Sequence, residues 1–222
     1  MKLFDIDNPV MRSLSKVADL VILNLLFLVC CLPIVTIGPA LTALYCVTMK
    51  LVRDEEGSIV KDFFQSFRLN FRQGVGIHLL LLLATAILAA DLWFVLYSKV
   101  DHGAMGYILF GVAAFLGVIT VMTLLYVYPV LAKFDNTIGK TLIVALTLAI
   151  RHLPTTLILA IIVAIPVGIM MIPNEAVISL IPVMLMFGFS AMAMAQAFFL
   201  RKVFDRYIPA EEDENVSSEV HT

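Results

Sequence analysis

Charged residues are scarce in this 222-residue chain, in which aspartate, glutamate, lysine and arginine together make up 14% of the sequence. Ordinary soluble domains carry about 25% charged and roughly 45–50% apolar residues. Here 61% of the residues are hydrophobic and the mean hydropathy is +1.00. The apolar residues form long runs between short charged clusters, which excludes an ordinary water-soluble fold. The sequence therefore predicts an all-α protein, a polytopic bundle of transmembrane helices.

Cysteine is also rare, and its placement excludes both a disulfide framework and a zinc site. Cys30, Cys31 and Cys46 lie within or beside apolar runs and lack zinc-ligand spacing, so we interpret them as small hydrophobic residues of membrane helices. The sequence also lacks a nucleophile motif, a metal-binding cluster, a phosphate loop and a catalytic pair of carboxylates. We therefore expect no enzymatic activity, no catalytic residue, no metal, no cofactor and no nucleic-acid partner.

The apolar runs predict six helices in a single transmembrane domain, residues 1–204. A helix needs about 20 mostly apolar residues to span the hydrocarbon core of a bilayer, and four runs meet this directly: 75–98, 104–132, 154–172 and 176–200. The first apolar stretch is interrupted by Pro33, Gly38 and Pro39, and predicts two shorter helices, 17–32 and 39–53. Gly38 permits the turn, and Pro39 suits the first position of a helix.

Lysine and arginine are distributed unevenly, which predicts the orientation of the chain. All of these 15 residues except Lys99 flank the first helix, fill the two long connectors or follow the last helix. Because short cytoplasmic loops are enriched in these residues, we expect both termini in the cytoplasm, with residues 205–222 as a polar tail. Residues 17–52 then cross the membrane twice or not at all. A full hairpin is our first interpretation, and a re-entrant pair is the alternative.

Two connectors, residues 59–72 and 137–152, are predicted to be amphipathic helices on the cytoplasmic side. In the first, aromatic residues at helical spacing occupy one face and basic residues another. We expect this helix to lie at the membrane interface, so the lipid bilayer is the first expected partner. The interfacial residues would be Phe63, Phe64, Phe67, Phe71, Arg68 and Arg72. Each connector precedes a pair of spans, which indicates either an internal duplication or an ordinary succession of hairpins.

The break in the first apolar stretch and the helix after it form a recognisable block within residues 33–73. Its parts are PIVTIGPA at 33–40, ALY at 43–45, RDEEG at 53–57 and KDFF at 61–64. With the hydropathy profile of nearly the whole chain, this block resembles the YesL-like family of bacterial membrane proteins of unknown function. Members are often encoded near carbohydrate-uptake genes. The resemblance implies a bacterial plasma-membrane protein tied to sugar import, with sugar ABC transporter components as candidate partners, and supplies no established site residue.

Asp91 is the most unusual single residue, because it lies within an apolar run about eight positions before Lys99. A carboxylate at membrane depth usually faces the bundle interior, a partner or a watery cavity. This would make Asp91 a binding residue. The alternative is a shallow, hydrated position near the outer interface, beside Trp93 and Tyr97.

The break at Thr36, Gly38 and Pro39 is the second candidate binding site. Unpaired N–H groups at the start of the following helix favour anions or polar ligands. A simple hairpin turn, however, requires the same residues. His78 follows nearby, either as a proton relay or as a histidine used in helix packing or at the interface.

The sequence thus favours a non-catalytic accessory or regulatory component of carbohydrate uptake. One alternative is a small transporter that uses the broken first helical pair and Asp91. Another is a membrane assembly scaffold.

Overall fold

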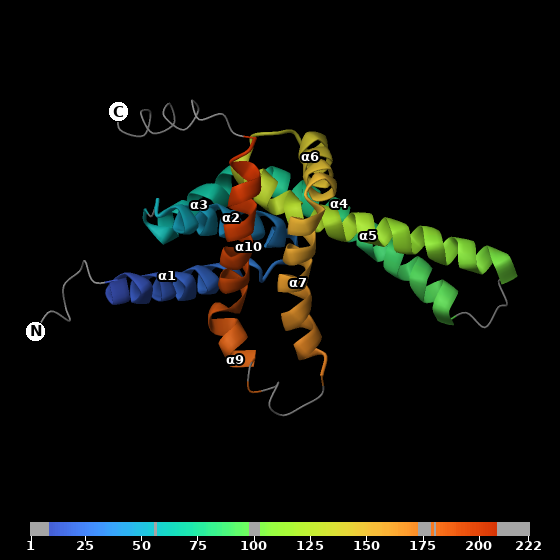
Figure 1. Cartoon of the computed structure of the whole chain (residues 1–222), viewed down its shortest axis with the longest axis horizontal. Helices are drawn as coiled ribbons and strands as arrows, with labels where there is room; N and C mark the ends of the chain where they lie inside the picture. Colours follow the sequence, from blue (N-terminus) through green and yellow to red (C-terminus); the bar gives the residue numbers. More distant parts are fainter. Residues whose placement is uncertain (1–8, 56, 98–102, 173–178, 180, 208–222) are drawn as a thin grey trace, which may run out of the picture.

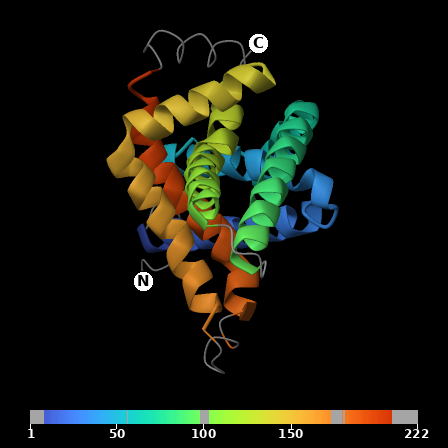
Figure 2. The same cartoon turned by 90° about the vertical axis from the view of Figure 1, so that its right-hand side faces the viewer.

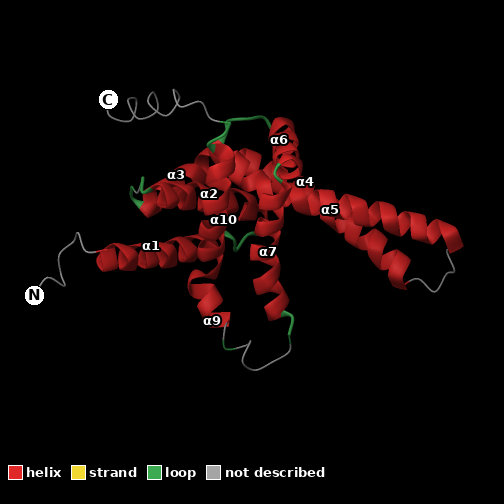
Figure 3. Cartoon of the chain, viewed as in Figure 1, coloured by secondary structure: helices red, strands yellow, loops and turns green. Residues whose placement is uncertain are grey.

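The computed structural model describes residues 9–55, 57–97, 103–172, 179 and 181–207 (Figure 1). Every regular element in these ranges is a helix (Figure 3), which confirms the all-α prediction. Lys99 and residues 208–222 of the predicted tail lie outside them. The elements are α1 (Pro9–Cys30), η1 (Ile34–Thr36), α2 (Ile37–Arg53), α3 (Ile59–Leu69), α4 (Phe71–Tyr97), α5 (Gly103–Lys133), α6 (Ile138–Arg151), α7 (Leu153–Met170), α9 (Ile181–Val183), the π-helical η2 (Met184–Gly188) and α10 (Phe189–Phe204).

Five helical segments in the described ranges are long and apolar enough to cross a membrane. They are Ile34–Arg53, Phe71–Phe94, Gly106–Lys133, Leu153–Met170 and Ile181–Phe204. Each of the four long apolar runs in the sequence overlaps one of these segments, with ends shifted by a few residues. The protein is therefore a multi-pass integral membrane protein.

Two helical hairpins, α4–α5 and α7–α10, extend in different directions from the part of the protein around α2, which we call the base. In Figure 1, α7 and α10 run downward from the base while α4 and α5 extend to the right, so that in the turned view of Figure 2 the α4–α5 hairpin points toward the viewer. Only 11% of the apolar window of α4, α5 or α7 is buried inside the protein, against 50% for α2. The outer parts of the hairpins therefore present their apolar side chains to the bilayer, and α2 lies at the centre of the protein.

The core around α2 explains how the base is held together. Leu44 and Val47 are almost completely buried in one cluster with Leu23 and Phe27 of α1 and Phe63 of α3. Full burial of such a side chain contributes roughly 1.5–3 kcal/mol. α3 packs on α2, the helix before it, and α6 packs in the same way on α5. Each predicted amphipathic helix is thus folded back against its preceding span.

Burial against α2 corrects part of the interfacial assignment of α3. The Phe63 ring is 0% exposed and belongs to the protein core, so its predicted contact with lipid is wrong. Phe64 and Phe71 are each 39% exposed, Phe67 is half-buried, and the basic residues of this face are exposed, namely Arg68 and Arg72. The helix also ends at Leu69, before the predicted end at residue 72. Amphipathic spacing shows which face of a helix is apolar. It does not show whether that face is buried against another helix or against lipid.

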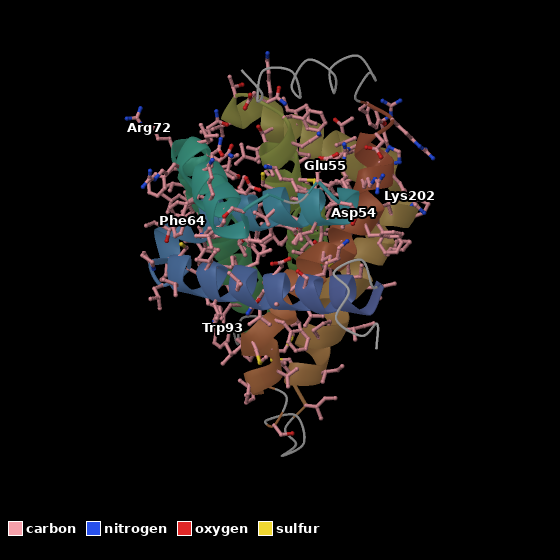
Figure 4. The ribbon with its side chains drawn as sticks, turned by 90° about the vertical axis from the view of Figure 1, so that its left-hand side faces the viewer. Asp54, Glu55, Phe64, Arg72, Trp93 and Lys202 are labelled. Carbon is pink, nitrogen blue, oxygen red and sulfur yellow. The ribbon has the colours of Figure 1, made fainter. Side chains whose placement is uncertain are left out.

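One end of the bundle, which we call the charged end, joins the start of α1 to the ends of α2 and α10. Lys16 pairs with Asp54, while Asp205 pairs with both Arg53 and Arg201. Asp54 caps α2 in the left-handed conformation, with φ of 58°. Because the start of α1 meets the end of α2, the two helices are antiparallel and form a hairpin. Figure 4 shows charged residues in the upper part of the view, with Asp54, Glu55, Arg72 and Lys202 labelled, and Trp93 in the lower part.

An asparagine of α1 is hydrogen-bonded into the irregular turn of the last span. The Asn24 side chain is fully buried; its Nδ2 donates to the Leu185 carbonyl at 2.7 Å, and its Oδ1 accepts from the Ser190 N–H at 3.0 Å. These two backbone groups are five residues apart, the spacing that a π-helical turn would pair directly. The Asn24 amide bridges them instead. Ser190 Oγ lies 2.7 Å from the Leu20 carbonyl and adds a second link between α1 and α10.

We predict that Asn24→Leu destabilises the protein, because it leaves the Leu185 carbonyl and the Ser190 N–H without their partner in an apolar interior. The expected loss is about 1–3 kcal/mol, measured as a lower midpoint of unfolding in a mild detergent. Leu25→Ala is the control, since Leu25 is on the same helix and is 52% exposed. Equal midpoints for Asn24→Leu and the unmodified protein would contradict the bridging role.

Candidate functional site

A polar pocket of about 370 Å³ lies where α2, α3, the start of α4 and the end of α5 meet. Helix α2 contributes Lys50 from its last turn, near the charged end. Leu69, Leu131 and Phe134 form apolar parts of the wall, and Cys46 also lines it. The polar lining consists of Lys50, Asp62, Gln65, Ser66, Asn70, Gln73, Lys133 and Asp135. Side chains from four helical elements therefore converge on one space.

Contacts among the lining residues fix part of the pocket wall. Lys50 Nζ lies 3.2 Å from Asp62 Oδ1, and the Asp62 side chain is only 14% exposed. Asn70 Nδ2 donates to the Ser66 carbonyl at 3.1 Å and lies 3.4 Å from Ser66 Oγ. The side-chain oxygen of Asn70 is not used in either contact. The wall thus combines an internal ion pair with amide groups that can both donate and accept hydrogen bonds.

A second group of polar side chains lies deeper along the same helices. Nδ1 of His78 is 2.9 Å from the Tyr128 hydroxyl, and the Tyr45 hydroxyl donates to Oε1 of Gln196. Gln196 is 2% exposed and Tyr128 is 4% exposed. Nε2 of His78 is buried and has no hydrogen-bond partner among the described residues. In α4, His78 follows the pocket residue Gln73 by about one and a half turns, so this group lies next to the pocket on its inner side.

Sequence reasoning identified only His78 in this inner group. Tyr45, Tyr128 and Gln196 were not among the predicted site residues. Gln196 did carry a signal, because it is an isolated amide in an apolar run of small residues. Polar residues buried in a membrane bundle usually pair across helices, and Gln196 does so with Tyr45.

The residues of the break, Thr36, Gly38 and Pro39, are used for the turn and for a close helix crossing. Thr36 Oγ1 lies 2.6 Å from the Cys30 carbonyl, which it satisfies at the end of α1. A Cβ on Gly38 would lie 2.2 Å from the Gly74 carbonyl oxygen, and one on Gly74 would lie 2.9 Å from Cα of Pro39. The first turn of α2 is therefore pressed directly against α4. None of these three predicted binding residues lines the pocket, so the structure favours the turn interpretation.

Asp91 lies apart from both polar groups. Its side chain is exposed on the outer part of α4, several turns beyond His78. Trp93 and Tyr97 lie on the same segment, and their rings stack with centroids 4.3 Å apart. Exposed aromatic residues of this kind suit the membrane–water interface. The structure therefore does not bring Asp91 together with the broken helical pair, and it favours a shallow position for the carboxylate.

Comparison with known proteins finds one family. Residues 20–92 match a family described as "Protein of unknown function, DUF624". The matched segment contains α2, α3 and the crossing of Gly38 with Gly74, and it contributes most of the polar pocket lining. No curated protein and no solved structure matches the chain. The similarity therefore covers most of the polar lining of the pocket, and the matching family has no assigned function.

The Gly38 crossing gives a direct test of the packing. We predict that Gly38→Ala lowers the free energy of unfolding by about 1–3 kcal/mol, because overpacking must displace the α4 backbone or strain a side chain. Gly111→Ala is the matched control, since a Cβ there would meet nothing within 4 Å. In the absence of the crossing, the two alanine variants would have similar midpoints of unfolding in detergent, and the packing described above would be incorrect.

Proposed function

We propose that this chain is a YesL-like, non-catalytic accessory subunit of carbohydrate uptake in the bacterial plasma membrane. The observation that carries the proposal is the polar pocket near the charged end, combined with hairpins whose outer halves are apolar and exposed. The resemblance of the block in residues 33–73 to the YesL-like family supplies the link to sugar uptake. The pocket provides a place where such a subunit could meet a small polar molecule.

We place the charged end, both termini and the pocket on the cytoplasmic side. Lysine and arginine support this orientation, because Lys16, Lys50, Arg53 and Arg201 all lie at or near the charged end, and short cytoplasmic segments are enriched in these residues. The loops at the tips of the two hairpins would then face outward.

An accessory role fits the distribution of buried polar groups better than independent transport does. A transporter needs polar groups along a route that reaches both sides of the membrane. In the described residues, the buried polar side chains are Asn24, Thr42, Thr48, Ser66, Thr123, Thr141, Thr156, Ser190 and Gln196. None belongs to residues 84–97, 103–118 or 162–170, the outer halves of three spans.

The proposal is tested by purification from native membranes in a mild detergent, from cells grown on a polysaccharide that induces uptake genes. We expect membrane subunits of a sugar-uptake system to be recovered with the tagged chain and to be absent from an untagged control. The purified chain alone should not conduct sugars in liposomes. Recovery of the chain without partners, together with sugar flux in liposomes, would contradict the accessory role.

A small transporter is the second candidate, and the buried group around His78 and Tyr128 favours it. These residues border the pocket and include a histidine nitrogen without a partner in the described chain. On this alternative, His78→Gln would abolish flux in the same liposomes. Asp91→Asn serves as the comparison, because Asp91 lies outside the buried group and its replacement would leave flux unchanged.

A further inference from the structure

We propose that the pocket between α2, α3, α4 and α5 binds a neutral, hydroxyl-rich ligand, a small saccharide of one or two rings. The inference rests on the proposed function only in choosing saccharides among hydroxyl-rich molecules. The size, the charge and the hydrogen-bonding groups of the pocket indicate that the ligand is small, neutral and rich in hydroxyl groups.

The size of the pocket selects a small ligand. Its volume of about 370 Å³ is near the lower limit of ligand sites in proteins, which run from roughly 300 to 1,000 Å³. A polysaccharide chain would not fit within it. One or two sugar rings are the appropriate scale for this space.

The charges of the lining favour a neutral ligand. Two lysines, Lys50 and Lys133, are balanced by two aspartates, Asp62 and Asp135. The pair of Lys50 with Asp62 is already formed at 3.2 Å, with little exposure of the Asp62 side chain. An anionic ligand would have to compete with Asp62 for Lys50, whereas a neutral ligand leaves this ion pair intact.

The polar groups that remain are suited to hydroxyls. A hydroxyl both donates and accepts a hydrogen bond, and so does a side-chain amide. Gln73 and Gln65 line the pocket, and their side-chain amides form no hydrogen bond with another residue in the described ranges. The Asn70 side-chain oxygen is not used by its contacts with Ser66. Three amides are thus available to neighbouring hydroxyl groups.

An aromatic ring completes the match to a sugar. Phe134 lines the pocket, and its ring packs edge-to-face on Phe204, with centroids 5.6 Å apart. A pyranose ring carries C–H groups on its faces as well as hydroxyls at its edge. Phe134 offers apolar surface for those faces, and the amides can bond the hydroxyls at the edge.

Cys46 provides a reporter inside the pocket, because its free thiol is part of the lining. In a Cys30→Ser, Cys31→Ser background it is the one remaining cysteine of the chain. We would measure its alkylation by N-ethylmaleimide in detergent with a mixture of neutral mono- and disaccharides. If alkylation requires an empty pocket, a ligand at ten times its Kd slows the reaction roughly tenfold. Inorganic phosphate and glutamate, tested separately, should give no such protection.

Variants of the lining residues distinguish a loss of saccharide binding from a general change in the structure of the protein. Gln73→Leu keeps the approximate size of the side chain but removes the amide, so saccharide protection should be lost while the alkylation rate without ligand is retained. Gln65→Leu, at an exposed position, gives a second test if Gln73→Leu does not fold. Lys61→Gln is the control, because Lys61 is on α3 outside the pocket lining, and protection should persist in this variant.

Absence of protection by the saccharides would overturn the proposal, as would equal or stronger protection by phosphate or glutamate. Protection that survives in both glutamine variants would also overturn it. The measurement uses the purified chain alone, so its outcome is independent of the partner experiment. If no uptake system is recovered with the chain, only the accessory role is contradicted. If no saccharide protects Cys46, only the saccharide-binding proposal is contradicted.

Discussion

Direct contact between the first turn of α2 and the backbone of α4 determines how the rest of the base is arranged. Gly38 and Gly74 allow this contact, since a Cβ at either position would meet the other helix within 3 Å. With α2 fixed against α4, α3 folds back on α2 through Phe63 and lies beside the start of α4. The pocket is the space that these three helices leave with the end of α5.

Membrane burial explains why several buried polar groups are paired across helices. An unsatisfied polar group in an apolar interior is costly, and the irregular π-helical turn before α10 creates such groups. Asn24 satisfies two of them, and Tyr45 pairs with Gln196 from the same last span. These contacts tie α1 and α2 to α10. Polar contacts therefore join the last span to α1 and α2, while the outer halves of α4, α5 and α7 need only lipid.

The sequence was sufficient to predict the helices, because long apolar runs and the Pro33 to Pro39 break are local signals. It could not predict the pocket, whose lining comes from residues as distant as Lys50 and Asp135. Phe63 shows the physical reason. Its helical spacing identified an apolar face correctly, but lipid and the side of α2 are both apolar, so periodicity could not tell them apart. The charge of Asp91 was evident from the sequence. What its side chain faces depends on the packing of the other helices around α4, which residue spacing does not reveal.

The central proposal is that the charged end of the bundle, with the pocket near it, faces the cytoplasm and that the α4–α5 hairpin extends away from it toward the opposite side. Topology reporters inserted after Val52, after Asn136, after Thr222 and near His102 measure this most directly. We expect cytoplasmic signals at the first three positions and an external signal at His102. A cytoplasmic signal at His102, or an external one at Val52, would contradict this proposal.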